Sequence, residues 1–396
     1  MFENLDALAP DPILGISAAF AADPSDSKVD VGVGVYRDDA GQTPVMRAVR
    51  IAQARVAELE RTKTYLPASG NAAFNAALTE LVLGTTHPAV TERRAVTLQT
   101  PGGCGALRLA ADLVHETAPG TRVALSTPTW PNHPALIGGA GLETVRYPYY
   151  DEAARGIDFP ALLASLDAMP AGTVILLQPS CHNPTGADLA DPQWEELLAV
   201  LQRRQLLPLL DLAYQGLGEG LEQDARWVRR LAAELPEVLI TVSCSKNFGL
   251  YRERVGAVIY TGRSPAEAHA VHTHLMRLAR RMYSMPPDHG AATVGVLWAD
   301  AALRADWQAE LDAMRQRLAA LRLDLADALG REIPRRDFSF IGRQRGMFSL
   351  LGLPPAAVEA LRHDHHVYCA PDSRINLAGL NPAAIARVVA AVAAVL

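Results

Sequence analysis

Short apolar runs alternate with amphipathic stretches through the middle of the chain. The clearest runs span residues 122–126, 173–178, 206–214 and 238–245. Their length is typical of strands, and helical patterns separate them, so together they predict a parallel sheet in an α/β domain. Residues 29–36 predict one further short strand near the N-terminus.

A long helical pattern extends from about residue 301 to residue 329. Apolar side chains recur along it at three- and four-residue spacing: Leu311, Met314, Leu318, Leu321 and Leu325. A helix of this length often joins two domains, and the short strand and helix patterns after it predict a smaller α+β domain. We therefore expect an N-terminal arm with part of the small domain at residues 1–35, a large domain at 36–310 and a small C-terminal domain at 311–396.

The composition is that of a globular protein with a large core, since 49% of the 396 residues are hydrophobic and 20% are charged. A net charge of −6 argues against nucleic acid as a partner and against a polybasic membrane anchor. No apolar stretch approaches the ~18 residues of a membrane span, and the N-terminus lacks a secretory pattern, so we expect a cytoplasmic protein. Four cysteines without a CxxC pair or a ligand cluster predict isolated thiols and no metal site.

Chemically active residues follow several of the predicted strands, at the sheet edge where ligands bind in parallel sheets. Lys246, one of only three lysines, follows residues 238–245; a desolvated lysine at such a place is a candidate Schiff-base nucleophile. Asp211 closes another apolar run, either as a local cap or ion-pair partner or as the counter-ion of a cationic cofactor atom. Arg254, eight residues after Lys246, can pair with a phosphate.

Three loops add further candidates. The glycine-rich turn at residues 102–105 enters an amphipathic helix, which suits a phosphate, although many such turns are only turns. Asn183 precedes a proline, which favours a fixed turn with a cis bond as one option. Trp130 is either a core residue or a stacking partner for a flat ring.

One ligand accounts for all of these features. A phosphate, a flat ring with a basic nitrogen and a carbonyl that reacts with a lysine are the parts of pyridoxal 5′-phosphate. Its protein partners are a Schiff-base lysine and an acid at the pyridine nitrogen.

Eight segments, in order and spacing, then resemble one family across nearly the whole chain: DPILG, GVGVYRD, TPGGCGALR, PTWPNH, CHNPTG, DLAYQG, SCSKNFGLYRERVGA and RRMYSMPPDHG. The chain resembles the class I, fold type I aspartate and aromatic amino-acid aminotransferases. This resemblance implies a large domain with a mostly parallel sheet of the seven-stranded type, flanked by helices, and a smaller α+β domain. It also implies pyridoxal phosphate as cofactor, amino-acid and 2-oxo-acid substrates and a homodimer with shared active sites.

The resemblance further implies the catalytic roles. Lys246 would hold the cofactor as a Schiff base and, once displaced, move the substrate's Cα proton. Asp211 would keep the pyridine nitrogen protonated, with His133 supporting it from behind. Tyr214 and Asn183 would bind the ring's phenolic oxygen.

The binding residues implied by the resemblance surround the ring, the phosphate and the substrate. Trp130 would stack on the ring. The phosphate would be held by Gly103, Cys104, Ser243 and Arg254, together with Tyr65 from the partner subunit. The substrate α-carboxylate would be bound by Arg374 and the backbone of Gly34, and a substrate side-chain carboxylate by Arg280 from the partner subunit.

Two positions depart from the family pattern. Cys104 stands where relatives have Thr or Ser, and a thiol is a weaker donor than a hydroxyl, so we expect weaker cofactor binding. Met285 stands where relatives usually have Asn or Ser, which removes a polar group near the substrate. Val35, Arg37 and Thr43 resemble the aspartate-specific branch, whereas YLPASG, the PTW loop, GADL and RRMYS resemble the aromatic branch.

We therefore expect a ping-pong aminotransferase that takes aromatic and dicarboxylic substrates with 2-oxoglutarate as acceptor. An aspartate-specific enzyme is the near alternative, and a β-lyase or oxidase on the same scaffold is a further one. An acyl-enzyme site at Ser243–Lys246 is disfavoured because no KTG motif accompanies it and the lysine follows a strand. A dinucleotide site at residues 102–105 is disfavoured because the full GxGxxG spacing is absent. A non-catalytic regulator is disfavoured because no DNA-binding domain is appended.

Overall fold

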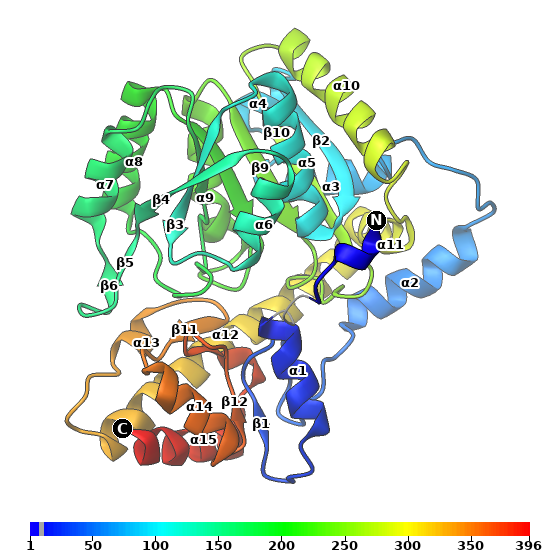
Figure 1. Cartoon of the computed structure of the whole chain (residues 1–396). Helices are drawn as coiled ribbons and strands as arrows, with labels where there is room; N and C mark the ends of the chain where they lie inside the picture. The colour runs from blue at the N-terminus through cyan, green and yellow to red at the C-terminus, as the bar shows by residue number, and fades with distance from the viewer. Residues whose placement is uncertain (8–11) are drawn as a thin grey trace. The chain divides into compact units, whose positions relative to one another are not determined.

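A computed structural model describes residues 1–7 and 12–396 (Figure 1). The DPILG segment begins at Asp11, outside the described residues. The chain forms two compact units. Unit 1 comprises residues 1–43, 184–186 and 318–396, and unit 2 comprises residues 44–183 and 187–317. The main boundaries between the units thus fall after residues 43 and 317. The sequence predicts them after residues 35 and 310.

Unit 2 is built on a seven-stranded sheet in the order β2-β10-β9-β8-β7-β3-β4. Neighbouring strands from β9 to β4 run parallel, and β10 is antiparallel to both β9 and β2. The predicted mostly parallel α/β sheet is therefore confirmed. The strands are β2 (Ala95–Pro101), β3 (Arg122–Thr127), β4 (Glu143–Pro148), β7 (Val174–Leu177), β8 (Leu207–Leu212), β9 (Val238–Ser243) and β10 (Val255–Thr261).

Helices cover this sheet on both faces (Figure 1). The helices that lie wholly in unit 2 are α2 (Arg47–Leu59), α3 (Ala72–Leu83), α4 (Pro88–Thr91), α5 (Gly102–Thr117), α6 (Asn132–Gly139), α7 (Phe159–Asp167), α8 (Asp191–Arg204), α9 (Leu221–Glu234), α10 (Pro265–Met282) and α11 (His289–Ala299). A small hairpin, β5 (Tyr150–Asp151) with β6 (Gly156–Ile157), leads into α7.

One core of unit 2 lies between the sheet and helices α5, α6 and α10. Alternate residues of the central strands face it, as Val174 and Leu176 of β7 do, and they meet Leu107 and Leu113 of α5. The intervening residues of β7 are also buried, because the opposite face of the sheet is covered as well. Burial on both faces explains why these strands are continuous apolar runs in the sequence.

Unit 1 contains the short elements from both ends of the chain. These are η1 (Phe2–Asn4), α1 (Pro12–Ala22), β1 (Val29–Asp30), α13 (Phe340–Arg343), β11 (Phe348–Leu350), α14 (Pro355–His363), β12 (Val367–Tyr368), β13 (Arg374–Asn376), η2 (Leu377–Gly379) and α15 (Pro382–Val395). Strand β1 pairs in parallel with β12, and β11 pairs in antiparallel with β13. Their core contains Val31, Leu325, Phe340, Ile375 and Val392.

The predicted strand at residues 29–36 was too long, since β1 is only Val29–Asp30. The Asp30 carboxylate accepts the backbone N–H of Gly32 at 3.0 Å, and this local turn ends the strand. The predicted long helix is α12 (Ala301–Glu332), which contains the change from unit 2 to unit 1. Among the described residues, no helix is long and apolar enough to cross a membrane.

Candidate active site

Asp211 lies in β8 near the carboxyl edge of the parallel strands and contacts two polar side chains. Its Oδ2 lies 3.2 Å from His133 Nε2, and its Oδ1 accepts a hydrogen bond from Thr241 at 3.3 Å. Thr129 Oγ1 lies 2.7 Å from His133 Nδ1 on the other side of the ring. An ionised carboxylate only accepts, so His133 donates through Nε2 and accepts at Nδ1 from Thr129. This buried carboxylate is thereby oriented to meet a cationic group.

Tyr214 and Asn183 lie together in the same unit, both almost fully buried. Asn183 Nδ2 donates to the Tyr214 hydroxyl at 3.4 Å. The main chain of Asn183 is fixed by Gln178, whose side-chain amide donates to the Asn183 carbonyl at 3.0 Å and accepts its N–H at 2.9 Å. The Asn183–Pro184 bond is trans, so the cis option was wrong: the Gln178 amide fixes this turn, and the cis bond among the described residues is Thr127–Pro128.

Lys246 follows β9 and is half-buried among aromatic rings. Its Nζ lies 6.0 Å from the centre of the Tyr214 ring and 4.9 Å from that of Tyr251. The next residue in the chain, Asn247, accepts the indole N–H of Trp307 at 2.8 Å, and Phe248 stacks on that indole at 4.5 Å. The main chain after the lysine is thus held rigidly by the start of α12.

The start of α5 forms a small concave surface with Ser243 and Arg254. A Cβ on Gly102, which has φ +72°, would overlap the Arg254 guanidinium, and a Cβ on Gly103 would lie 3.1 Å from Ser243 Cβ. Glycine is therefore required for this close approach. Backbone N–H groups at a helix N-terminus, a hydroxyl and a guanidinium form a donor set that suits an anion such as a phosphate ester.

Cys104 and Trp130 lie beside this surface. The half-buried Cys104 has the Asn132 side-chain amide 3.9 Å from its Sγ. The Trp130 ring is also half-buried and meets the His133 ring edge-to-face at 5.2 Å. Trp130 thus has one aromatic neighbour while part of its ring remains accessible.

Tyr65 and Arg280 are exposed on unit 2. Tyr65 is 86% exposed, and Arg280 lies in the last turn of α10, where its guanidinium contacts the Ser284 hydroxyl. The backbone N–H next to Tyr65, that of Leu66, points to Met285 Sδ at 3.2 Å. The sequence predicts that Tyr65 and Arg280 act in a second subunit, and that prediction requires them to be accessible.

Gly34 and Arg374 belong to unit 1. The guanidinium of the buried Arg374 donates to the Gly32 carbonyl at 2.9 Å and lies 4.4 Å from the centre of the Phe348 ring. A Cβ on Gly34 would lie 2.7 Å from Phe348 Cζ. These two residues therefore share one neighbour, the Phe348 ring, and their part in substrate binding stays a prediction.

Sequence reasoning missed the residues that hold the predicted ones in place. Thr129 and Thr241 contact the His133–Asp211 pair, and Gln178 holds Asn183. A further buried histidine, His182, lies 3.1 Å from Ser126 Oγ and stacks on Tyr149 at 4.1 Å. Burial lowers the pKa of His182 to about 3. Only the position of Thr129 four residues before His133 hinted at its contact.

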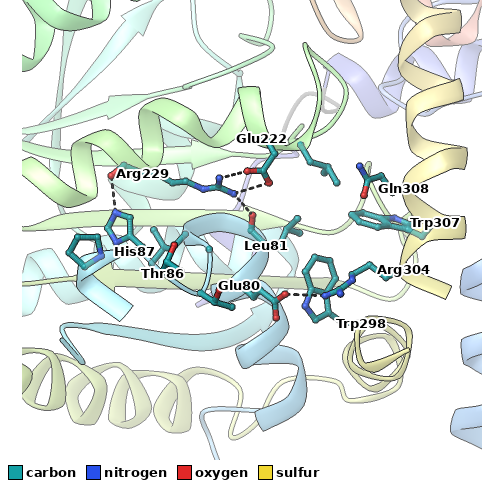
Figure 2. Close-up of a pocket in the computed structure, with 15 residues that line it drawn as sticks. Glu80, Leu81, Thr86, His87, Glu222, Arg229, Trp298, Arg304, Trp307 and Gln308 are labelled. Carbon is teal, nitrogen blue, oxygen red and sulfur yellow. Dashed lines mark hydrogen bonds and ion pairs between the residues drawn. The ribbon is translucent and has the colours of Figure 1, made fainter. Parts of the chain in front are cut away.

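A separate cavity of about 610 Å³ lies in unit 2 (Figure 2). Two ion pairs face it, Arg229 with Glu222 at 2.5 Å and Arg304 with Glu80 at 3.0 Å. The residues that line it are different from the predicted site residues. The cavity is therefore distinct from the group around Asp211 and Lys246.

Comparison with known proteins identifies the family. Residues 26–392 match the family described as aminotransferase class I and II. The chain belongs to the class I and II aminotransferases. The Pseudomonas aeruginosa aromatic-amino-acid aminotransferase is 47% identical over 394 residues, which cover 100% of this chain and 98% of that protein. The Escherichia coli aspartate aminotransferase is 42% identical and covers all of both chains.

A solved structure shows the same fold as this aminotransferase. The Burkholderia pseudomallei aromatic-amino-acid aminotransferase, covalently bound to pyridoxal phosphate, superposes with a TM-score of 0.97 at 44% identity. The match covers 100% of this chain and 99% of that one. The predicted family and fold class are thus confirmed, and both branches weighed from the sequence, aromatic and aspartate, occur among the relatives.

Proposed function

We propose that this aminotransferase uses pyridoxal 5′-phosphate to move the amino group of an aromatic or dicarboxylic L-amino acid to 2-oxoglutarate. The observation that carries the proposal is one arrangement in unit 2. A lysine, a buried carboxylate paired with histidine and an anion-binding helix start all belong to the carboxyl edge of one sheet. One pocket serves both the amino acid and the oxo acid, so the kinetics are ping-pong.

The residues present fit the cofactor. The surface formed by Gly102, Gly103, Ser243 and Arg254 suits a phosphate, because Gly102 lets the Arg254 guanidinium lie against the helix start, where a Cβ would overlap it. Asp211, buried and fixed by His133, suits a protonated ring nitrogen. When bound, the cofactor supplies an electron-accepting ring that acidifies the substrate Cα–H bond.

The chain's own residues then perform the remaining tasks. Asp211 orients the ring and keeps its nitrogen charged, and Trp130 packs on the ring face. Tyr214 and Asn183 donate to the ring's phenolic oxygen, where they stabilise negative charge. The Lys246 amine takes the proton from the substrate Cα and returns it to the cofactor carbon, as a positioned general base can do.

Substrate binding is proposed for three further residues. Arg374, with the Gly34 backbone, binds the α-carboxylate through its planar guanidinium. Arg280 of the partner subunit binds a side-chain carboxylate when the substrate is dicarboxylic. Met285 replaces a polar group near that position and favours a less polar side chain.

The active unit is proposed to be a homodimer in the cytoplasm. Tyr65 and Arg280 are exposed, and neither has a use in catalysis unless a second subunit receives it. An aspartate-specific aminotransferase remains the second candidate, since Val35, Arg37 and Thr43 resemble that branch. A β-lyase or oxidase would form an oxo acid without an amino acceptor.

Absorbance of the cofactor-loaded protein tests the proposal. L-phenylalanine and L-aspartate are added separately in single half-reactions, without an acceptor. We expect each amino acid to convert the yellow form of the cofactor, and the faster one identifies the branch. A yellow form that neither amino acid changes would contradict the proposal, and continued oxo-acid release without 2-oxoglutarate would favour the lyase or oxidase.

A further inference from the structure

The loop after Tyr214 is held by a buried carboxylate that lies ten residues further along the chain. Asp224, in the first turn of α9, is only 4% exposed. Its Oδ2 accepts the backbone N–H of Gly216 at 2.8 Å and of Gly218 at 3.0 Å. Its Oδ1 accepts the N–H of Glu219 at 2.8 Å. One side chain therefore accepts three backbone N–H groups of the loop that follows Tyr214.

The loop is also held from its opposite end. Gln215, directly after Tyr214 and 1% exposed, donates from Nε2 to the carbonyls of Leu81 at 3.0 Å and Leu221 at 3.1 Å. Gly216 has φ +97°, and a Cβ there would lie 2.5 Å from Leu311 Cδ2. These contacts thus restrict the main chain next to Tyr214 to one conformation.

The chemistry of Asp224 matches this role. Burial raises the pKa of its carboxyl, and the three backbone N–H groups act in the opposite direction by stabilising the anion. A carboxylate can accept all three hydrogen bonds, whereas an amide has only one oxygen and would present its own N–H₂ to loop donors. An aspartate at this position therefore satisfies the loop N–H groups better than a neutral amide of the same size can.

We propose that Asp224 is a positioning residue for Tyr214, acting through the backbone of residues 216–219. It sets the position of the Tyr214 hydroxyl, which accepts from the Asn183 amide, and so how strongly that hydroxyl donates to the cofactor. The inference rests on the proposed cofactor role of Tyr214. It adds a residue that touches neither cofactor nor substrate.

The first measurement uses the cofactor-free protein. In Asp224→Asn, we expect the backbone amides of residues 214–220 to exchange with deuterium at least tenfold faster than in the wild type. Asp158→Ala, which removes the half-buried side-chain cap of α7, is the control for loss of a carboxylate contact to backbone N–H groups elsewhere in unit 2. Unchanged exchange in Asp224→Asn would overturn the proposal whatever the cofactor does.

The second measurement is the pH titration of cofactor absorbance in the loaded protein. We expect Asp224→Asn to shift the midpoint by half a pH unit or more, in the same direction as Tyr214→Phe. The double variant should have the midpoint of Tyr214→Phe alone, because Asp224 acts through the hydroxyl that this variant lacks. Asp158→Ala should keep the wild-type midpoint.

An Asp224→Asn midpoint equal to the wild type, or additive shifts in the double variant, would overturn the positioning role and leave the proposed function standing. A wild-type protein without a titrating cofactor band would overturn the proposed function and this inference together. If Asp224→Asn does not fold, Asp224→Ser replaces it, since a single hydroxyl oxygen cannot accept all three of the loop N–H groups that the carboxylate accepts. The same outcomes then decide.

Discussion

At the scale of single residues, the site depends on a few polar atoms whose partners are specified by geometry. Asp211 accepts from His133 and Thr241, and His133 accepts in turn from Thr129. Each contact fixes the protonation or the direction of the next one. A single substitution should therefore slow the reaction strongly at Asp211, whereas one at Cys104 should change cofactor affinity only modestly.

Cys104→Thr should strengthen cofactor binding. A hydroxyl in place of the thiol adds one neutral hydrogen bond, worth about 0.5–1.5 kcal/mol, which corresponds to a ~2- to ~13-fold lower dissociation constant. Titration of the cofactor-free protein with pyridoxal phosphate measures it. Cys104→Ala is the control and should bind no more tightly than the wild type; equal or weaker binding by Cys104→Thr would contradict the prediction.

Asp211→Asn should slow the half-reaction with either amino acid. The amide cannot hold a charge-assisted hydrogen bond to a protonated ring nitrogen, a loss of about 1.5–3 kcal/mol and hence a ~10- to ~150-fold lower rate. Stopped-flow absorbance measures the rate. The exposed Asp167→Asn, which loses only a surface ion pair with Arg203, should react like the wild type. A wild-type rate in Asp211→Asn would exclude this carboxylate from the chemistry.

At the scale of elements, side-chain contacts connect segments that belong to or follow different strands of the sheet. His182 follows β7, and its ring lies against Ser126 of β3 and on Tyr149 after β4. Gln178 and Asp188 hold the same segment, the latter by accepting the N–H groups of Cys181 and His182 at 2.8 and 2.9 Å. This packing excludes water from the His182 ring and keeps the ring neutral.

Stability should therefore fall as the pH is lowered from 6.5 toward 3. In this range the unfolded chain binds a proton at His182 while the folded state, with its pKa near 3, does not. The contribution is fully present above pH 6.5 and declines by about 1.4 kcal/mol per pH unit below it, or about 2 kcal/mol at pH 5.

Urea unfolding of the whole protein at pH 7 and pH 5 measures this change in the free energy of unfolding. His182→Gln should show a smaller loss between the two pH values than the wild type, by about 2 kcal/mol. His363→Gln, at an exposed histidine of α14, is the control and should keep the wild-type difference. Equal pH dependence in His182→Gln and the wild type would contradict the assignment.

At the scale of the whole molecule, each active site of the proposed dimer would contain residues from both chains. Lys246 would act in its own subunit, whereas Arg280 and Tyr65 would act in the partner. All three belong to unit 2 of one chain, and Tyr65 and Arg280 are exposed there. A monomer would then lack part of both substrate and phosphate binding.

Mixing two inactive variants tests this arrangement. Lys246→Ala and Arg280→Ala should each lose activity toward aspartate, but a mixed dimer contains one site with both residues intact. Unfolding and refolding the two together should restore activity, up to about one quarter of the wild-type value for random pairing. Refolded Lys246→Ala alone is the control; no recovery in the mixture, or full activity of sedimenting monomers, would contradict shared sites.

Much of this architecture could be predicted because the chain's patterns are local. Strands β7, β8 and β9 are continuous apolar runs, and Asp211 and Lys246 occur at their carboxyl ends, so their common edge follows from parallel pairing alone. The strand at residues 29–36 was predicted too long because the turn at Asp30 depends on one side-chain hydrogen bond that periodicity does not record.

The sequence by itself determined the α/β class, the family and the residue types at the sheet edge, because strand length, apolar periodicity and short motifs each depend on neighbouring residues. Only the tertiary structure decided which partners hold those residues: Thr241 for Asp211, Trp307 for the main chain after Lys246 and Leu81 for the loop after Tyr214. These pairs are separated by 30 to 134 residues in the chain. Strand register and helix packing bring such residues together, and both are set by the whole core rather than by any local segment.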